Sequence, residues 1–245
     1  MMSAKGYCRQ CGDNHFLPQG KALSACKALM ELLERHRHLM IFHPSSAADP
    51  SLSTDYLFGE ARGKMFGVLV GMDARGRAVT LYAFSGQYNG HWMVPGWVGP
   101  VFSKVAFDRV NRPSEKAIKQ MGVRIDGIPQ VNPLCAELKK ERKQRSRQLM
   151  QEIFDLYRFR NFRGETAPLI DIYGNPGLPP TGTGDCCAPK LLHHAASNYI
   201  RPEGMAEFYW GLENASRTRS HGQFYPPCAS KCQPILGFLL CGIAS

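Results

Sequence analysis

Two cysteine-bearing segments in the last third of the chain contain the residue types that bind metal ions. The first reads Thr-Gly-Thr-Gly-Asp-Cys-Cys-Ala-Pro-Lys over residues 181–190, and the second reads Pro-Pro-Cys-Ala-Ser-Lys-Cys over residues 226–232. We expect a helix to begin at each segment, where backbone N–H groups and the helix dipole favour a thiolate. Because the thiolate is the form of cysteine that binds zinc, the pattern predicts a zinc site.

Three sulfur atoms are the expected zinc ligands at this site. Cys228 and Cys232 are four residues apart, and on a helix that spacing places both side chains on one face. Cys186 would provide the third ligand, with Cys187 as the alternative, and water would take the fourth position, as in catalytic zinc sites. Buried thiols without a metal are the competing interpretation, since free cysteine is often buried.

The two segments resemble the metal site of zinc-dependent nucleobase deaminases. In that pattern a glutamate in the first motif moves protons, and two residues separate the cysteines of the second motif. Here three residues separate Cys228 and Cys232, and an alanine stands at the glutamate position. A relocated carboxylate would have to serve instead, and the candidates are Asp185, Glu207 and Glu165. Asp185 has an alternative role as a helix N-cap.

A cysteine nucleophile with a histidine base is a further catalytic interpretation. Cys186 or Cys187 would be the nucleophile. The candidate bases are His193, His194 and His221, although the first two lie about two turns along the same expected helix, too far for a direct pair.

An N-terminal cysteine pair predicts a second, structural zinc site. Cys8 and Cys11 form a Cys-x-x-Cys pair, and His15 and Cys26 follow it. Cysteine and histidine in this combination are the usual ligands of structural zinc. No second pair accompanies the first, so the identity of its partners stays open.

The charge of the chain favours a polyanionic partner. The 245 residues carry a formal net charge of +10, and Lys and Arg are the side chains that contact nucleic-acid phosphates. A basic helix is expected at about 137–160, and aromatic residues alternate with arginines after it. This combination suits contacts with RNA phosphates and bases. A solvated helix face whose aromatic residues belong to the core would give the same pattern. The candidate RNA-binding residues are Lys139, Lys140, Arg142, Lys143, Arg145, Arg147, Arg158 and Arg160, and the basic stretch continues to Arg163.

The elements that position these residues follow from the apolar pattern. Residues 65–72 and 78–84 predict a β-hairpin with Gly76 in the connection. Residues 43–58 predict a polar loop, and 103–135 show no clear pattern. The expected helices cover about 21–38, 137–159, 186–197 and 228–241, with a strand at 203–209 between the last two.

This order predicts an α/β fold, with a small sheet flanked by helices. It also resembles the core of the cytidine deaminase fold, although the chain ends soon after the last helix, so the final strands of that sheet would be missing or supplied otherwise. We expect two parts: a Cys-containing helical segment over 1–58, and the deaminase-like domain over 59–245. The nine cysteines, without an apolar signal core or a run of transmembrane length, indicate a cytoplasmic protein with reduced thiols.

Several longer segments resemble those of a known protein family. They include Gly63–Val70, Ala83–Gly86, Arg163–Glu165, Pro180–Cys186, Ala188–Leu192, Met205–Gly211 and Phe224–Cys228. Together they resemble the N-terminal extension of long bacterial RluA-type pseudouridine synthases, over about residues 60–240. The chain lacks the His-Arg-Leu-Asp type of segment that carries synthase catalysis, so it is not expected to be a synthase itself.

The resemblance implies a role in RNA modification, with tRNA or rRNA and a pseudouridine synthase as partners. The expected function is a zinc-binding, RNA-associated accessory protein. The alternative is a zinc-dependent hydrolase, a nucleobase deaminase with a relocated catalytic carboxylate. A purely structural domain with free thiols is a third interpretation.

Overall fold

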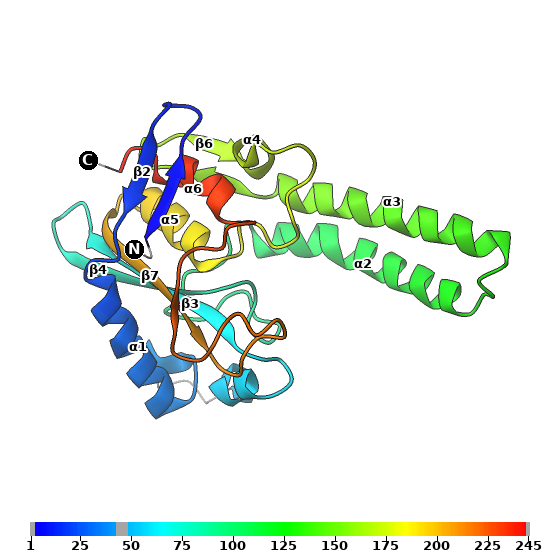
Figure 1. Cartoon of the computed structure of the whole chain (residues 1–245), viewed down its shortest axis with the longest axis horizontal. Coiled ribbons are helices and arrows are strands. Elements are labelled where there is room, and N and C mark those ends of the chain that lie inside the picture. The colour runs from blue at the N-terminus through cyan, green and yellow to red at the C-terminus, as the bar shows by residue number, and fades with distance from the viewer. Residues whose placement is uncertain (1–2, 43–48, 244–245) are drawn as a thin grey trace.

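The computed structural model describes residues 3–42 and 49–243, and it shows a mixed α/β protein (Figure 1). Part of the expected polar loop, residues 43–48, lies outside the described residues. The rest of that loop forms two short 3-10 helices, η2 (Pro50–Leu52) and η3 (Thr54–Phe58).

A four-stranded antiparallel sheet with the order β4-β3-β7-β8 lies at the centre of the molecule. β3 (Lys64–Met72) and β4 (Ala78–Phe84) confirm the predicted hairpin. The predicted strand is also present, as β7 (Arg201–Trp210), and it pairs with the other edge of β3. The short strand β8 (Phe224–Tyr225) completes the sheet.

Apolar side chains cover both faces of this sheet, which is why β3 reads as a continuous apolar run. Phe66 and Val68 belong to one buried cluster, whereas Leu69 belongs to the other. Successive residues of a strand point to opposite faces. In β7, Ala206 and Phe208 therefore face the first cluster, and Glu207 between them faces the second.

Helices cover each face. On one face lies α1 (Ala22–His36), which confirms the first predicted helix, preceding the short 3-10 helix η1 (Met40–Phe42). On the other face lies α5 (Cys187–Ser197). Gly67 allows α5 to approach closely, because a Cβ atom there would lie 2.6 Å from the Cβ of Cys187.

A β-hairpin that the sequence did not predict precedes α1 in the N-terminal segment. Strands β1 (Ala4–Tyr7) and β2 (Asn14–Leu17) pair in antiparallel register. This hairpin packs on α6 (Gln233–Leu240), with Gly237 against the backbone of Tyr7. The two ends of the described chain are therefore in direct contact.

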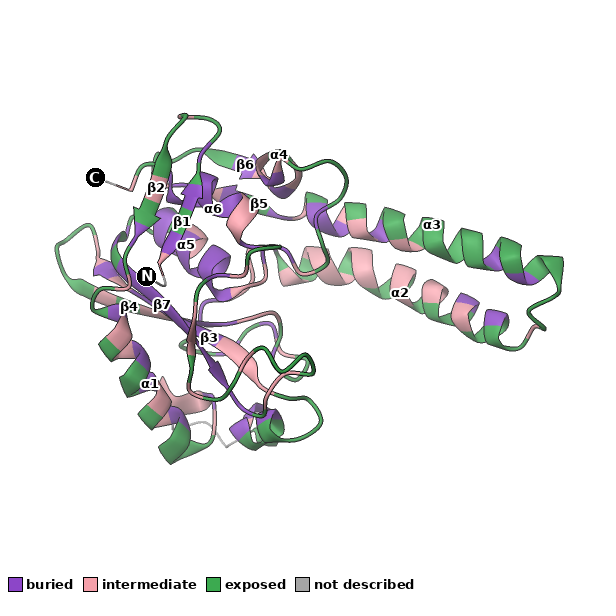
Figure 2. Cartoon of the chain, viewed as in Figure 1, coloured by how far each residue is buried: buried purple, intermediate pink, exposed green. Residues whose placement is uncertain are grey.

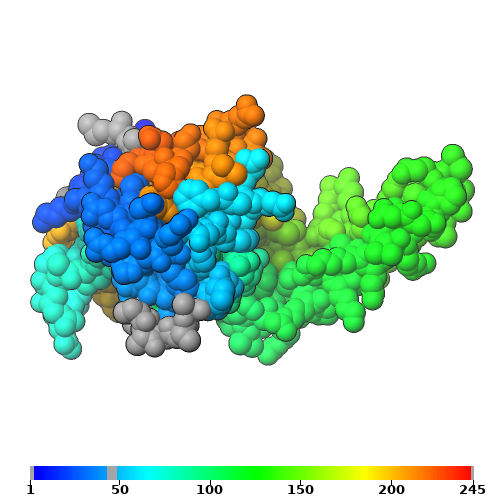
Figure 3. All heavy atoms as spheres, turned by 90° about the horizontal axis from the view of Figure 1, so that it is seen from below, coloured from blue at the N-terminus to red at the C-terminus, as the bar shows by residue number. Residues whose placement is uncertain are grey.

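Two long helices form an arm that projects from the body of the molecule (Figures 1 and 3). The unassigned region 103–135 contains all of α2 (Lys104–Asp126), and the basic helix is α3 (Pro133–Asp155). The two helices pack against each other, and the side chains along the outer part of the arm are mostly exposed (Figure 2).

The caps of the arm explain where its helices begin. The Ser103 side chain accepts a hydrogen bond from the backbone N–H of Ala106, and the Asn132 side chain accepts one from Leu134, with Pro133 at the first helical position. After α3 the chain continues into a small hairpin of β5 (Arg158–Arg160) and β6 (Thr166–Pro168), and then into α4 (Leu169–Tyr173).

The last predicted helix begins later than expected, because α6 starts at Gln233, and residues 229–232 form a turn. Among the described residues no strand follows α6. The described helices include none that is both long and apolar enough to cross a membrane.

Candidate metal centres

The three sulfurs expected to bind zinc lie together at the starts of α5 and α6. The Sγ of Cys228 is 3.9 Å from that of Cys186 and 3.4 Å from that of Cys232, and all three lie within 4.8 Å of one another. Ligands of a tetrahedral zinc ion with Zn–S bonds of about 2.3 Å lie about 3.8 Å apart. The cluster therefore has the spacing that a single ion needs, with three protein ligands.

The local structure at Cys228 corrects one expectation. The two cysteines do not share the face of a helix, because α6 begins only after Cys232. They instead close a turn, in which the N–H of Cys232 donates to the carbonyl of Cys228 at 3.2 Å. This turn has the same i to i+4 closure as a helix, which is why the sulfurs still meet.

Cys187, the alternative ligand, points away from this cluster. It is completely buried, and its thiol lies 3.4 Å from the carbonyl oxygen of Met65 and 3.6 Å from that of Ala83. These contacts direct its sulfur into the sheet. Of the two adjacent cysteines, Cys186 is therefore the one positioned to bind a metal with Cys228.

Hydrogen bonds among the three thiols of the cluster shift their pKa values. Hydrogen bonds from Cys186 and Cys232 hold the pKa of Cys228 far below its usual range. The same hydrogen bonds raise the pKa of Cys186 and of Cys232. A thiolate stabilised by two thiols is the state from which a metal ion displaces the remaining protons.

Glu207, one of the carboxylate candidates, is buried close to this cluster. It is 4% exposed, and its Oε1 accepts a hydrogen bond of 2.7 Å from the backbone N–H of Ala188. Ala188 is the residue at the glutamate position of the deaminase pattern. Burial raises the pKa of Glu207 to about 7, with a further contribution from the charge on Cys228.

Asp185, a second candidate, is held by a different group. Its Oδ1 accepts a hydrogen bond of 2.6 Å from the hydroxyl of Tyr157, and burial raises the pKa of the carboxyl group. It does not cap α5, whose N-cap residue is Cys186 without a side-chain hydrogen bond. Glu165, the third candidate, instead accepts a hydrogen bond from the Asn161 side chain and forms an ion pair with Arg163.

The histidines considered as bases have other partners. The Nδ1 of His193 accepts from the backbone N–H of Arg160 at 3.1 Å, and burial lowers its pKa to about 4. The Nδ1 of His221 accepts from the N–H of Gly211. Within the described part of the chain, neither ring is hydrogen-bonded to a cysteine thiol.

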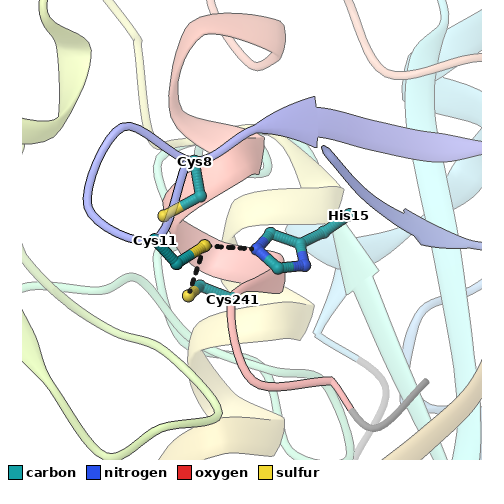
Figure 4. Close-up of side chains that lie close together, drawn as sticks. All are labelled: Cys8, Cys11, His15 and Cys241. Atoms are coloured by element: carbon teal, nitrogen blue, oxygen red, sulfur yellow. Dashed lines mark hydrogen bonds between the residues drawn. The ribbon is translucent and has the colours of Figure 1, made fainter. Parts of the chain in front are cut away.

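A second cluster joins the N-terminal hairpin to the end of α6. Its members are Cys8, Cys11, His15 and Cys241, whose ligand atoms all lie within 4.8 Å of one another (Figure 4). The Sγ of Cys11 is 3.0 Å from the Nε2 of His15 and 3.5 Å from the Sγ of Cys241. Three sulfurs and one imidazole nitrogen form a complete ligand set for a structural zinc ion.

The turn between β1 and β2 places the first two ligands. The N–H of Cys8 donates to the carbonyl of Asp13 at 2.8 Å, and Gly12 supplies the positive φ of 77° that the turn needs. Partial desolvation raises the pKa of Cys11, but hydrogen bonds from the Asp13 backbone and from His15 outweigh it and lower that pKa to about 7. A thiolate is thus accessible at neutral pH.

Cys26 is not part of this cluster, which corrects the expectation for its fourth member. Cys26 is completely buried in α1, and its sulfur lies 3.5 Å from the carbonyl oxygen of Ala206. Burial raises the pKa of Cys26 to about 12. The fourth member is Cys241, 230 residues from Cys11. Its sequence signals were an incomplete N-terminal pair and a C-terminal cysteine without an assigned role.

No protein-family model matches the chain, and no curated protein or solved structure does so either.

The candidate RNA-binding residues separate into two groups. Six are exposed on α3, in the arm, whereas Arg158 and Arg160 lie in β5 on the body. The aromatic residues between these arginines do not offer a stacking surface, because Tyr157 and Phe159 are buried in the core. The six exposed residues are Lys139, Lys140, Arg142, Lys143, Arg145 and Arg147.

Proposed function

We propose that this protein binds two zinc ions and associates with RNA as an accessory protein in RNA modification. The observation that carries the proposal is the cluster of Cys8, Cys11, His15 and Cys241, whose four ligand atoms converge from both ends of the described chain. Zinc bound there would join the N-terminal hairpin to α6 and contribute directly to folding.

The three-sulfur cluster supports a second zinc ion of a different kind. Cys186, Cys228 and Cys232 supply three ligands, and the fourth position would be open to water or a substrate atom, as in catalytic zinc sites. When bound, the ion would lower the pKa of such a water.

The arm supports the association with RNA. Its helix α3 exposes six Lys and Arg side chains, and of these Arg145 has an acidic partner, Glu141, at 3.0 Å. Exposed cations on a projecting helix pair can follow a phosphate backbone. The pseudouridine synthase partner and the choice between tRNA and rRNA rest on the sequence resemblance, as does the RNA-modification context.

A zinc-dependent nucleobase deaminase is the second candidate function, and Glu207 is the observation that favours it. Its carboxyl group is hydrogen-bonded to Ala188 at the start of α5, and a pKa of about 7 suits a group that both accepts and donates a proton. The deaminase-like core is part of this second candidate, and the order of the hairpin β3–β4, helix α5 and strand β7 supports it. Asp185 is the weaker candidate, because Tyr157 already binds it.

Metal content tests the proposal. We expect two zinc ions per chain in protein purified under reducing conditions and analysed by plasma mass spectrometry. Cys241→Ser and Cys228→Ser should each remove one ion. Cys135→Ser is the matched control, since Cys135 is buried in the arm, away from both clusters, and it should keep both. A metal-free wild-type chain would overturn the proposal.

RNA binding is tested separately by fluorescence anisotropy with labelled tRNA and rRNA fragments. The logarithm of the affinity should fall linearly with the logarithm of the salt concentration, and each Lys or Arg of α3 changed to Gln should lower that slope by about one. Binding that does not depend on salt, or no binding, would remove RNA from the proposal and leave a zinc protein.

A further inference from the structure

A cavity of about 430 Å³ lies on the body of the molecule, beside the second cluster and away from the arm. Three segments line it: the β5–β6 turn, the connection from α5 to β7, and the residues that follow Cys241. The lining includes Arg160, Arg163, Tyr199, Arg201, Gly242 and Ile243.

Three arginines give this cavity a positive charge. Arg160 forms no ion pair among the described residues, and its buried Nε has no hydrogen-bond partner there. Arg163 and Arg201 have acidic neighbours, Glu165 at 3.4 Å and Glu203 at 3.1 Å, but these glutamates do not line the cavity. Guanidinium groups bind phosphate with paired hydrogen bonds.

An exposed aromatic ring stands at the edge of the same cavity. Tyr199 is 71% exposed, and the guanidinium carbon of Arg160 lies 5.6 Å from its ring centroid. A large ring of this kind, next to cations, is a surface on which a nucleic-acid base can stack. The apolar part of the lining, with Ile200 and Ile243, suits the base and the sugar.

The backbone at Tyr199 is in a conformation that glycine would adopt more easily. Its φ is 55°, and it follows Asn198, the C-cap of α5, at the position where helices usually end with glycine. The N–H of Ile200 donates to the carbonyl of Ala195 at 2.9 Å, which completes this helix end. A tyrosine therefore stands where its side chain is unfavourable for the backbone.

We propose that this cavity binds one nucleotide unit of a single-stranded RNA, with the phosphate between Arg160 and Arg201 and the base on the ring of Tyr199. The proposal rests on the association with RNA proposed above and gives it a specific site. It also differs from the arm, because it predicts contact with an unpaired base as well as with the phosphate backbone.

The test is anisotropy with a labelled ten-nucleotide single-stranded RNA, using zinc-loaded protein whose metal content and circular dichroism are checked for every variant. Arg160→Gln combined with Arg201→Gln should weaken binding at least tenfold. Arg35→Gln is the control, because Arg35 is exposed on α1, on the opposite face of the sheet, and it should bind as the wild type does.

Tyr199→Gly separates a binding role from a structural one. Glycine suits the local backbone, so the unfolding temperature should stay the same or rise. Loss of the ring should nevertheless weaken RNA binding about tenfold, and Tyr199→Phe should restore it. A Tyr199→Gly variant that binds as tightly as the wild type would overturn the stacking proposal.

Competitors identify the source of the ligand. An unlabelled RNA oligomer should displace the probe at a concentration far below that of uridine monophosphate or a polyglutamate peptide. A monophosphate as effective as the oligomer would indicate a free-nucleotide site, and an equally effective peptide would indicate charge alone; either result overturns the proposal.

The cavity proposal and the proposed RNA association can be overturned separately. If the wild type binds RNA and only the arm variants weaken it, the cavity proposal is overturned and the RNA association stands. If the wild type binds no RNA in any assay, both are overturned, whereas the zinc content is unaffected.

Discussion

The two cysteine clusters are built from similar residues but are closed to different degrees. The cluster of Cys8, Cys11, His15 and Cys241 has four ligands, whereas the other has three sulfurs. Among the described residues, a buried carboxyl group, that of Glu207, lies close to the three-sulfur cluster, and the charge of Cys228 raises its pKa. A closed ligand set is typical of structural zinc sites and an open position of catalytic ones, so under the proposal above the two clusters have different roles.

The largest expected difference between the clusters is in stability. Cys241→Ser should lower the free energy of unfolding by about 5 kcal/mol or more, because a structural zinc ion contributes folding energy. For a chain of this size that loss lowers the unfolding temperature by about 10 °C or more. Cys228→Ser should have a smaller effect in the same calorimetric scan.

The order of these two effects is the informative result. Equal unfolding temperatures for Cys241→Ser and Cys228→Ser would mean that both clusters are structural. Cys135→Ser gives the cost of losing a buried thiol without losing a ligand.

Glu207→Gln should affect chemistry and leave metal binding intact. Glutamine can still accept the hydrogen bond from Ala188, so zinc content and unfolding temperature should not change. If the three-sulfur cluster deaminates a nucleobase, the rate of ammonia release from RNA or nucleosides should fall at least a hundredfold. The matched change Asp185→Asn, at the carboxyl group held by Tyr157, should have a smaller effect on the rate.

A histidine outside both clusters contributes its own loss of stability in acid. Burial lowers the pKa of His193 to about 4 from the usual 6.5. The unfolded chain therefore binds a proton first, so stability falls as the pH decreases from about 6.5 towards 4, by about 2 kcal/mol after allowance for partial exposure. His193→Gln should flatten the urea-unfolding free energy over this window.

The effect of His193 needs to be separated from protonation of the zinc ligands, which also releases metal in acid. Zinc content measured over the same pH range makes that separation. If His193→Gln loses stability in acid as the wild type does, protonation of the cluster ligands, and not of His193, causes the loss of stability.

The smallest expected difference is in the rate of zinc loss. A chelator should remove zinc from the three-ligand cluster about tenfold faster than from the four-ligand cluster, because an open position admits the chelator directly. Cys228→Ser and Cys241→Ser each leave one cluster, so the two phases can be assigned with a colorimetric zinc indicator. A single phase in the wild type would contradict the distinction.

The sequence predicts the three long strands of the central sheet and the helices α1, α3, α5 and α6, but it misses α2 and the two small hairpins. Compact apolar runs mark the strands, and apolar periodicity marks α1. Helix α2 was missed because only two of its residues are buried, Met121 and Ile125. Its pattern is set by packing on α3, a contact that no local rule contains.

The candidate sites show the same limit. Cys186, Cys228 and Cys232 could be selected from local spacing, since Cys186 and Cys232 are the N-cap residues of α5 and α6 and Cys228 lies four residues before Cys232. Cys241 could not, because it meets Cys11 only after the whole chain has folded. The cavity near Tyr199 also escaped prediction, since three segments distant in sequence form it.

The separation of 230 residues between Cys11 and Cys241 has a consequence for synthesis. At about 5–20 residues per second, the ribosome adds Cys241 on the order of 10–50 seconds after Cys11. During that interval the emerging chain offers at most three of the four ligands. Under the proposal that this cluster binds zinc, the ion is captured late in synthesis, and a product that stops short of Cys241 keeps its other ligand thiols exposed to oxidants.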